Sequence, residues 1–447
     1  MNNIKLIFFY SNLICIFHSI IILPFYRIYP ENSNDEVEKN IYNNIFIDIE
    51  IGTPPQKIPF KFSTSSFGTY VASDLITGNF EKFTDSLSRT FNLLSEETIS
   101  FHIQPVETGH IGSDIMLINN YKFNGMKFII ADKMHHPVSG VIGLKTQDKH
   151  DEKVLDCNFI KNLKQKDLIN SYAFTIYYDN ETSGKIIIGD LPHVFDKKYY
   201  SINDFNYGSA EIRAGNDIEW DVKFSEINYG DVYTDVNLVG ELDVEFGLLL
   251  APNPFKIHIE NNFFKKYLIS RICIKKSGSY YYDSFYYYAC KKPDPKERYT
   301  EQFNISEFKN ITFVKNEWKV NITFTKEELF FEDEENYYFK IVIQEKAYRW
   351  ILGNLFSSKI NITYDQDRKI IGTYVKSEEH QNLKKKKKNY IIYTFIYIAL
   401  IIVIILSIIL YKNVTQFVRK KRKYEIIDEY DTTINYSEVK NQKSIEI

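Results

Sequence analysis

The chain has 447 residues, which is enough for two domains of ordinary size. Hydrophobic residues make up 44% of it and aromatic residues 16%, so a large buried core can form. The formal net charge of −3 excludes a strongly basic protein, and we expect no nucleic-acid partner.

The N-terminus predicts a leader for the secretory pathway. Lys5 precedes an apolar run from Leu6 to Leu23, which Pro24 ends. A charged start before such a run is typical of a signal peptide, which we place at residues 1–26. An uncleaved anchor is the alternative. A short acidic segment, residues 27–40, follows it.

Strand patterns dominate the middle of the chain. Residues 45–51 and 337–344 alternate apolar and polar side chains, and residues 185–189 form an apolar run expected of a fully buried strand. Helical spacing of apolar residues is confined to residues 159–170 and 254–269. We therefore expect a mostly β protein with short helices.

Several short segments within residues 42–375 stand in a distinctive order. An Ile-Gly-Thr-Pro-Pro-Gln turn leads into Phe-Ser-Thr-Ser-Ser, and an aromatic residue, Tyr70, follows shortly after. The segments are Ile51–Gln56 with Phe62–Ser66, Ser139–Leu144, Ser183–Asp190, Gly240–Leu249 with Pro252, Trp350–Asn354, and Tyr364–Asp365 with Ile371–Gly372. Together they resemble the pepsin-like aspartic protease family, peptidase family A1.

The resemblance implies a bilobal acid-protease fold with a central cleft. The first lobe would cover residues 41–203 and the second lobe residues 206–377. Each lobe of this family offers one active-site loop, so the two loops are expected to face one another across the cleft.

The resemblance also places two residues on the catalytic positions. Asp243 matches the second catalytic aspartate of the family, whereas Ser63 stands where the first is expected. Aspartic proteases use two carboxylates that share one proton, and a serine hydroxyl is neither an acid nor a base near neutral pH. Losing one member of such a unit costs several powers of ten in rate. We therefore expect an inactive family member, although its status as an enzyme stays open.

Other positions near the site depart from the family pattern as well. Thr64 and Ser65 follow Ser63, but Val244 and Glu245 stand in the second loop where the family has threonine and glycine. The hydrogen-bond net between the loops should therefore be broken on one side. Tyr70 replaces the usual tryptophan. The tyrosine position of the flap falls on His102, or on Phe101 if the spacing differs by one residue.

Three rival interpretations concern the same region. Ser63, His102 and Asp243 have the residue types of a nucleophilic triad, but in this family a bound peptide separates flap from loops. Glu241, Asp243 and Glu245 would share one face of a straight strand and could hold a cation, although solvated acids at a strand edge are favoured. His135 and His136 are expected in a surface loop. We expect no metal and no cofactor.

Three cysteines lie outside the predicted leader, which contains Cys15. The resemblance places Cys273 and Cys290 near a disulfide of the family, so we expect this pair to form a bridge in an oxidising compartment. Cys157 is then expected to be a buried thiol, with an intermolecular bridge as the alternative.

The C-terminal part predicts a membrane anchor. Residues 390–411 are continuously apolar and long enough to cross a bilayer, after a basic linker at residues 378–389. With the leader, this predicts a type I protein whose tail, residues 412–447, is cytosolic. Five candidate glycosylation sites lie in the part expected to be lumenal: Asn180, Asn304, Asn310, Asn321 and Asn361.

The tail carries one candidate sorting signal. Tyr424 and Ile427 frame a Tyr-X-X-apolar pattern shortly after the predicted span, where a vesicle adaptor could read it. The basic residues 419–423 before it are expected to lie against anionic lipid headgroups.

These observations favour an inactive, membrane-anchored aspartic protease-like glycoprotein. Its cleft would bind an extended peptide or protein partner, in the lumen of the secretory or endosomal pathway or at the cell surface. The alternatives are an active membrane-anchored aspartic endopeptidase that uses Asp243, and a structural or adhesive surface protein.

Overall fold

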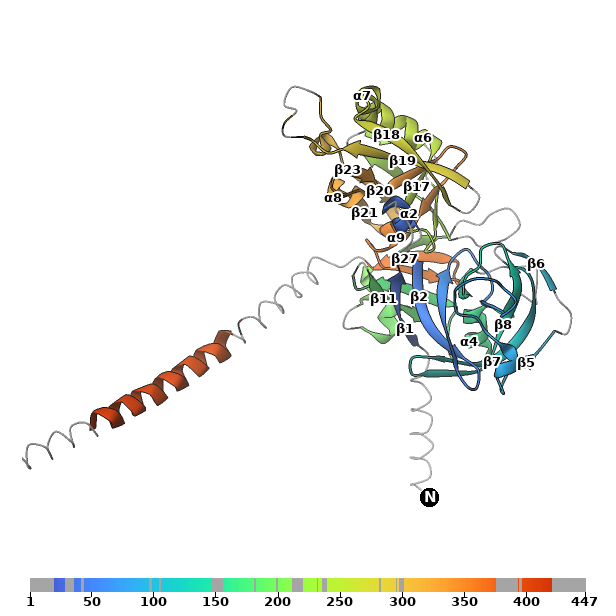
Figure 1. Ribbon diagram of the computed structural model, residues 1–447, viewed down its shortest axis with the longest axis horizontal. Coiled ribbons are helices and arrows are strands. Elements are labelled where there is room, and N and C mark those ends of the chain that lie inside the picture. Colours follow the sequence, from blue (N-terminus) through green and yellow to red (C-terminus); the bar gives the residue numbers. More distant parts are fainter. Residues whose placement is uncertain are drawn as a thin grey trace, which may run out of the picture. The chain divides into compact units, whose positions relative to one another are not determined.

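The computed structural model is shown in Figure 1. The residues that it describes are 20–28, 36–41, 44–95, 99–103, 106–145, 156–180, 182–197, 200–210, 220–230, 232–234, 239–280, 283–294, 296, 301–374, 393 and 396–419. The chain divides into a compact unit up to residue 375 and a second unit from residue 376, and each is described by itself.

Strands dominate the first unit, as the sequence predicts. They form sheets of 14, nine and four strands. In the first sheet the order is β12-β27-β26-β10-β11-β1-β2-β3-β9-β4-β8-β7-β5, with β6 paired to β7. Its strands are β1 (Ile21–Ile28), β2 (Asn44–Ile51), β3 (Gln56–Ser63), β4 (Tyr70–Ala72), β5 (Asn92–Leu93), β6 (Ile99–Ile103), β7 (Val106–Ile118), β8 (Tyr121–Met134), β9 (Gly140–Gly143), β10 (Ala173–Tyr178), β11 (Ser183–Ile188), β12 (Phe205–Ser209), β26 (Ile362–Asp365) and β27 (Ile370–Tyr374).

The other two sheets use strands from the second half of the unit. The nine-stranded sheet has the order β13-β16-β25-β17-β24-β19-β23-β22, with β18 paired to β19. Its strands are β13 (Asp221–Lys223), β16 (Val239–Leu242), β17 (Leu249–Pro252), β18 (Cys273–Tyr280), β19 (Asp283–Lys291), β22 (Phe330–Glu332), β23 (Asn336–Phe339), β24 (Ile341–Gln344) and β25 (Trp350–Leu352). The four-stranded sheet is β15-β14-β20-β21, made of β14 (Glu226–Tyr229), β15 (Val232–Thr234), β20 (Ile311–Lys315) and β21 (Val320–Phe324).

Helices in this unit are short. The α-helices are α2 (Glu36–Ile41), α4 (Phe159–Gln165), α5 (Pro192–Phe195), α6 (Asn253–Ile259), α7 (Lys265–Ile269), α8 (Lys326–Leu329) and α9 (Asn354–Ser357). A π-helical segment, η4 (Glu260–Phe264), joins α6 to α7, and the 3-10 helices are η2 (Asp85–Leu87), η3 (Ile202–Asp204), η5 (Ile305–Glu307) and η6 (Asn316–Trp318).

The local predictions are confirmed in part. Residues 45–51 lie in β2, with alternating burial, and residues 185–188 lie in β11. The prediction of one strand over residues 337–344 is wrong. This segment is divided at Lys340 into two strands. β23 pairs with β22 and β19, whereas β24 pairs in parallel with β17. The helix predicted over residues 159–170 ends at Gln165.

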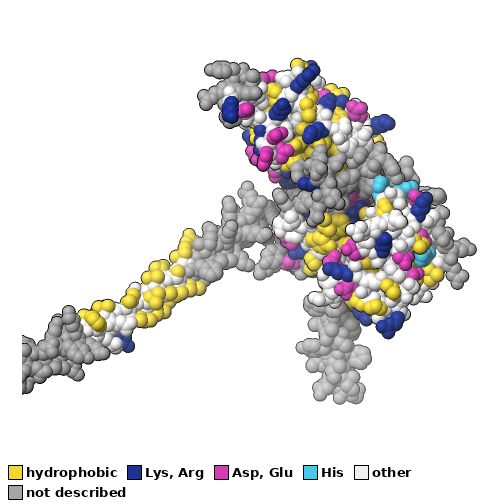
Figure 2. All heavy atoms as spheres, in the orientation of Figure 1, with side chains coloured by type: hydrophobic (Ala, Val, Ile, Leu, Met, Phe, Trp, Pro, Cys, Tyr) yellow, Lys and Arg dark blue, Asp and Glu magenta, His cyan; other side chains and the backbone are white. Residues whose placement is uncertain are grey.

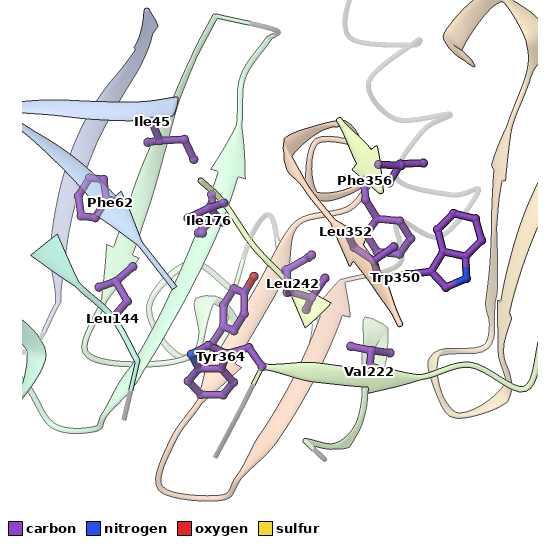
Figure 3. Close-up of a cluster of buried hydrophobic side chains, with 14 of the residues drawn as sticks. Ile45, Phe62, Leu144, Ile176, Val222, Leu242, Trp350, Leu352, Phe356 and Tyr364 are labelled. Carbon is purple, nitrogen blue, oxygen red and sulfur yellow. The ribbon is translucent and has the colours of Figure 1, made fainter. Parts of the chain in front are cut away.

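One hydrophobic core extends from the first sheet into the second. Figure 3 shows part of it, and a single cluster of buried side chains includes residues of both sheets. Phe62 at the end of β3 and Leu242 at the end of β16 belong to this cluster, and they are 0% and 1% exposed. The ends of these two strands are therefore fixed on the same core.

β1 is an inner strand of the first sheet and overlaps the predicted leader. It pairs with β11 on one side, where Leu23 faces Ile186, and with β2 on the other. Ile21, Leu23 and Phe25 are at most 3% exposed. Removal of residues 1–26 would take away most of this strand.

The acidic segment that follows also packs against the fold. In α2, Val37 and Ile41 are fully buried in a cluster with Phe246 and Leu248. The backbone N–H of Gly247 donates to the carbonyl of Ile41 at 2.8 Å. Residues 36–41 therefore support the chain that follows Asp243.

The disulfide prediction is confirmed. Cys273 at the start of β18 faces Cys290 in β19, and the two sulfur atoms are bonded. Cys157 keeps its thiol and is fully buried.

In the second unit, one described helix is long and apolar enough to cross a membrane. It covers Ile396–Arg419 and therefore continues past residue 411, where the sequence predicted its end. Figure 2 shows hydrophobic side chains along most of its visible surface. Tyr424 and Ile427 lie outside the described residues.

We expect Leu23→Ala to lower the free energy of unfolding by about 2–5 kcal/mol, because it leaves a cavity between β11 and β2. Ile22→Ala is the matched control, since Ile22 is 37% exposed and should change stability far less. Urea unfolding of the full chain in detergent, followed by tryptophan fluorescence, measures both. Equally small effects would show that the mature protein lacks β1, as cleavage at residue 26 predicts.

Candidate active site

Two loops meet where β3 and β16 end. β3 ends at Ser63 and pairs in parallel with β9, and β16 ends at Leu242 and pairs in parallel with β25. Between them lies the buried Thr64, whose Oγ1 donates to the carbonyl of Leu242 at 3.0 Å and accepts from the N–H of Val244 at 3.2 Å. Val244 has no hydroxyl that could make the equivalent hydrogen bonds to the first loop. This set of hydrogen bonds is therefore made from one side only, by Thr64, as predicted.

Glu245 reaches across to the first loop. Its Oε1 accepts hydrogen bonds from the hydroxyls of Ser63 and of Ser65, the latter at 2.7 Å. The Ser63 Oγ in turn accepts from the N–H of Ser66 at 2.8 Å. Ser63 is thus a donor that holds a carboxylate from the opposite loop.

Lys61 completes this network, and the sequence reasoning missed it. Its ammonium pairs with Oε2 of Glu245, and each of the two side chains is 8% exposed. Phe60 and Phe62, on either side of Lys61 in β3, are fully buried. The sequence does contain a signal for a buried lysine, because Lys61 lies between two phenylalanines in an otherwise apolar stretch of the strand. Because an unpaired buried charge costs several kcal/mol, each of the two groups stabilises the other.

Asp243 lies beside this ion pair and is 9% exposed. Its Oδ1 accepts from the N–H of Glu245 at 2.8 Å, and its own N–H donates to the carbonyl of Leu352 at 3.2 Å. Burial, and then the negative charge of Glu245, raise the pKa of Asp243 to about 7, although the Glu245 N–H and Lys61 oppose the rise. Asp243 is therefore largely protonated in acidic surroundings.

The pKa of Glu245 is shifted in the opposite direction. Burial by itself would raise its pKa, but the charge of Lys61 and the hydrogen bonds from Lys61, Ser63 and Ser65 outweigh burial and lower the pKa. The site thus holds one protonated carboxyl and one carboxylate below pH 7. The two oxygens of that carboxylate are already occupied by an ammonium and two hydroxyls.

The three acids of the second loop do not form a cation site. Glu241 pairs with Arg349, which also contacts Asp221 at 3.2 Å, so Glu241 is held apart from the Glu245 network. Groups of acidic, histidine and cysteine residues suited to a metal are absent from the described residues. The favoured interpretation, solvated acids at a strand edge, is wrong for Asp243 and Glu245, which are 9% and 7% exposed.

The remaining predicted site residues are placed as follows. Tyr70 is buried in β4, and Phe101 and His102 lie in β6, the strand that pairs with β7, although their side chains are outside the described set. His135 pairs with Glu107 at 2.9 Å rather than with a metal. The nucleophilic triad gains no support, because Ser63 is fully buried and donates to Glu245.

Comparison with known proteins explains this geometry. The sequence profile of the family described as eukaryotic aspartyl protease matches residues 44–374. The chain belongs to this family. Its mostly β fold is that of an aspartyl protease.

Two curated relatives match over part of their length. Cathepsin D of Gallus gallus is 25% identical over 238 residues, which cover 49% of this chain and 57% of that protein. Plasmepsin VI of Plasmodium berghei (strain Anka) is 29% identical over 171 residues, which cover 34% of this chain and 39% of that protein. The match thus spans about half the length of these relatives.

Replacement of Asp243 by asparagine tests the protonation of this site. The pKa of Asp243 is raised to about 7 in the folded protein from its ordinary value of 3.8, so between these two pH values the folded protein holds a proton that the unfolded chain has lost. The free energy of unfolding that Asp243 contributes therefore falls as pH rises through this window and is level above it. We expect the stability advantage of Asp243→Asn to grow by about 2 kcal/mol between pH 5 and pH 7. Urea unfolding at each pH measures it; a constant advantage would contradict the assignment.

A second prediction concerns the ion pair. Lys61→Met leaves Glu245 buried without its cation and should lower the free energy of unfolding by about 3–5 kcal/mol. Adding Glu245→Gln should recover much of that loss. Lys57→Met, in the same strand, is the control, because Lys57 pairs with Asp48 at 2.7 Å while its side chain is 65% exposed. That variant should lose far less stability than Lys61→Met, because solvent screens an exposed ion pair. Similar losses in the two single variants would argue against a buried pair.

Proposed function

We propose that this family member is catalytically silent and binds an extended peptide or protein segment. The observation that carries the proposal is the network at the first-aspartate position. There, Ser63 donates to Glu245, and Lys61 neutralises Glu245. A water molecule beside Asp243 would lack an available carboxylate to take its proton.

The chemistry of Glu245 supports this conclusion. A general base has to accept a proton at the operating pH, and its efficiency falls as its pKa moves below that pH. The pKa of Glu245 is lowered, and protonation would break its buried contact with Lys61. Glu245 therefore acts as a structural link between Ser63 and the second loop.

Binding does not need the catalytic pair. Extended segments can be held through backbone hydrogen bonds and side-chain pockets, and the family fold provides a cleft for them. The relatives named above, a cathepsin and a plasmepsin, share that fold with this chain. We infer from the fold and the retained loops that peptide binding is kept although the pair of catalytic aspartates is lost.

We also propose that the binding part faces the lumen or the outside of the cell. The apolar helix Ile396–Arg419 would anchor it in a membrane of the secretory or endosomal pathway. The exposed side chains of Asn180, Asn304, Asn310 and Asn321 suit glycosylation. Asn361 is less suited, because Thr363 of the same sequon is fully buried.

One observation favours a second candidate, an aspartic endopeptidase with an altered pair. The pKa of Asp243 is raised and that of Glu245 is lowered, and carboxyl groups separated in this way can serve as acid and base. In this case Glu245 would replace the missing first aspartate.

Cleavage of a peptide library by the full chain in detergent, from about pH 3 to pH 7, separates the two candidates. We expect no cleavage from folded protein. Asp243→Asn and Glu245→Gln serve as controls for contaminating protease. Cleavage that disappears in both variants would establish the altered pair, and cleavage that survives in both comes from a contaminant.

Peptide capture tests binding itself. We expect the full chain to retain members of a display library of extended peptides, and Ser65→Trp to lose them because the indole fills the space between the loops. Ser86→Trp is the matched control on the surface helix η2, where Ser86 is exposed. Capture that is unaffected by Ser65→Trp, or no capture, would favour a structural or adhesive role.

A further inference from the structure

A surface pocket lies away from the active-site loops, where the first sheet meets strands of the second half. Its volume is about 620 Å³, within the range of sites that bind small molecules. It opens beside β12 and beneath the turn that follows β20. The lining residues are Tyr207, Gly208, Ser209, Lys223, Phe224, Ser225, Lys315, Glu317 and Ile370.

Lys315 provides a fixed positive charge in this pocket. Its side chain is 6% exposed, and its ammonium donates to the carbonyl of Lys223 at 2.9 Å. A carboxylate of Glu317, whose side chain is 58% exposed, lies 3.4 Å from it. An ammonium has three protons, so one proton of Lys315 is left for a ligand. This contact with a largely exposed side chain shows that the ammonium of Lys315 binds a carboxylate.

The frame around Lys315 is preformed. The indole N–H of Trp318 donates to the carbonyl of Ile371 at 3.3 Å, which joins η6 to β27. The N–H of Asn316 donates to the hydroxyl of Ser225 at 3.3 Å. At Gly208 an added Cβ would lie 3.0 Å from Cε of Lys315, so glycine lets the lysine lie against β12.

The other walls combine a second cation with apolar surface. The Lys223 ammonium makes no ion pair among the described residues, and its side chain is exposed. Phe224 and Ile370, at 1% and 9% exposure, give the pocket apolar side chains, and the ring of Tyr207 is 54% exposed. One end of a ligand would therefore meet positive charge and the other end apolar surface.

We propose that this pocket binds an organic carboxylate that carries an apolar group. The carboxylate displaces Glu317 from Lys315 and is also drawn by Lys223, while the apolar group packs on Phe224 and Tyr207. The carboxylate can belong to a small molecule or to an acidic side chain of a peptide beside an aromatic residue, because the two share the same chemistry.

Calorimetric titration of the full chain in lipid nanodiscs with 3-phenylpropionate tests the proposal. We expect binding that 3-phenylpropanamide, the neutral analogue, does not reproduce, and inorganic phosphate should bind more weakly because it lacks the apolar group. Acetyl-Glu-Phe-amide against acetyl-Gln-Phe-amide distinguishes the peptide source from the free acid. Equal binding of acid and amide, or no binding of either acid, would overturn the proposal.

Variants connect binding to the pocket. Lys315→Met should weaken 3-phenylpropionate binding about tenfold or more, and Glu317→Gln should strengthen it about threefold by removing the competing carboxylate. Lys223→Met, at an exposed position, keeps the test valid if Lys315→Met fails to fold, and should weaken binding several-fold. Lys346→Met, an exposed lysine elsewhere, is the matched control. Binding that none of the pocket variants changes would place the ligand elsewhere and refute the assignment.

Discussion

The buried contact between Lys61 and Glu245 is the constraint on which the centre of this protein depends. It takes a cation from β3 and a carboxylate from the loop after β16, both nearly excluded from solvent. Two charges removed from water stabilise a fold only when each is well paired. The contact therefore fixes the two loops relative to one another, and the charge of its carboxylate adds to burial in raising the pKa of Asp243.

The strands and hydrogen bonds around this contact also position the two loops. Thr64 still ties the first loop to the second, and the parallel pairs of β3 with β9 and of β16 with β25 still present both loops from one core. Glu245 stands where a small residue is expected, and the serines at 63 and 65 give it donors. The serines thus supply the hydrogen-bond donors that the buried Glu245 carboxylate needs, because every member of a buried polar network has to be satisfied.

The motifs predicted the family and its mostly β fold, because these depend on short segments whose spacing survives in the sequence. Lys61 could not be recognised in the same way. It lies four residues after Lys57 in one strand and so on the same face, yet Lys57 is 65% exposed while Lys61 is 8% exposed. The difference comes from Glu245, far along the chain. The predicted leader, residues 1–26, overlaps β1, because an apolar run alone does not distinguish a leader from a buried strand.

β1 also limits the order in which the first sheet can form. It is the first described strand to leave the ribosome, but Leu23 has to wait for Ile186 before that side is covered. The same sheet later receives β26 and β27, whose last residue is Tyr374. Such distant pairings close slowly and leave apolar edges open meanwhile. This sheet can therefore close only after the chain has been translated as far as Tyr374, and β1 stays without one of its partner strands until β11 has been translated.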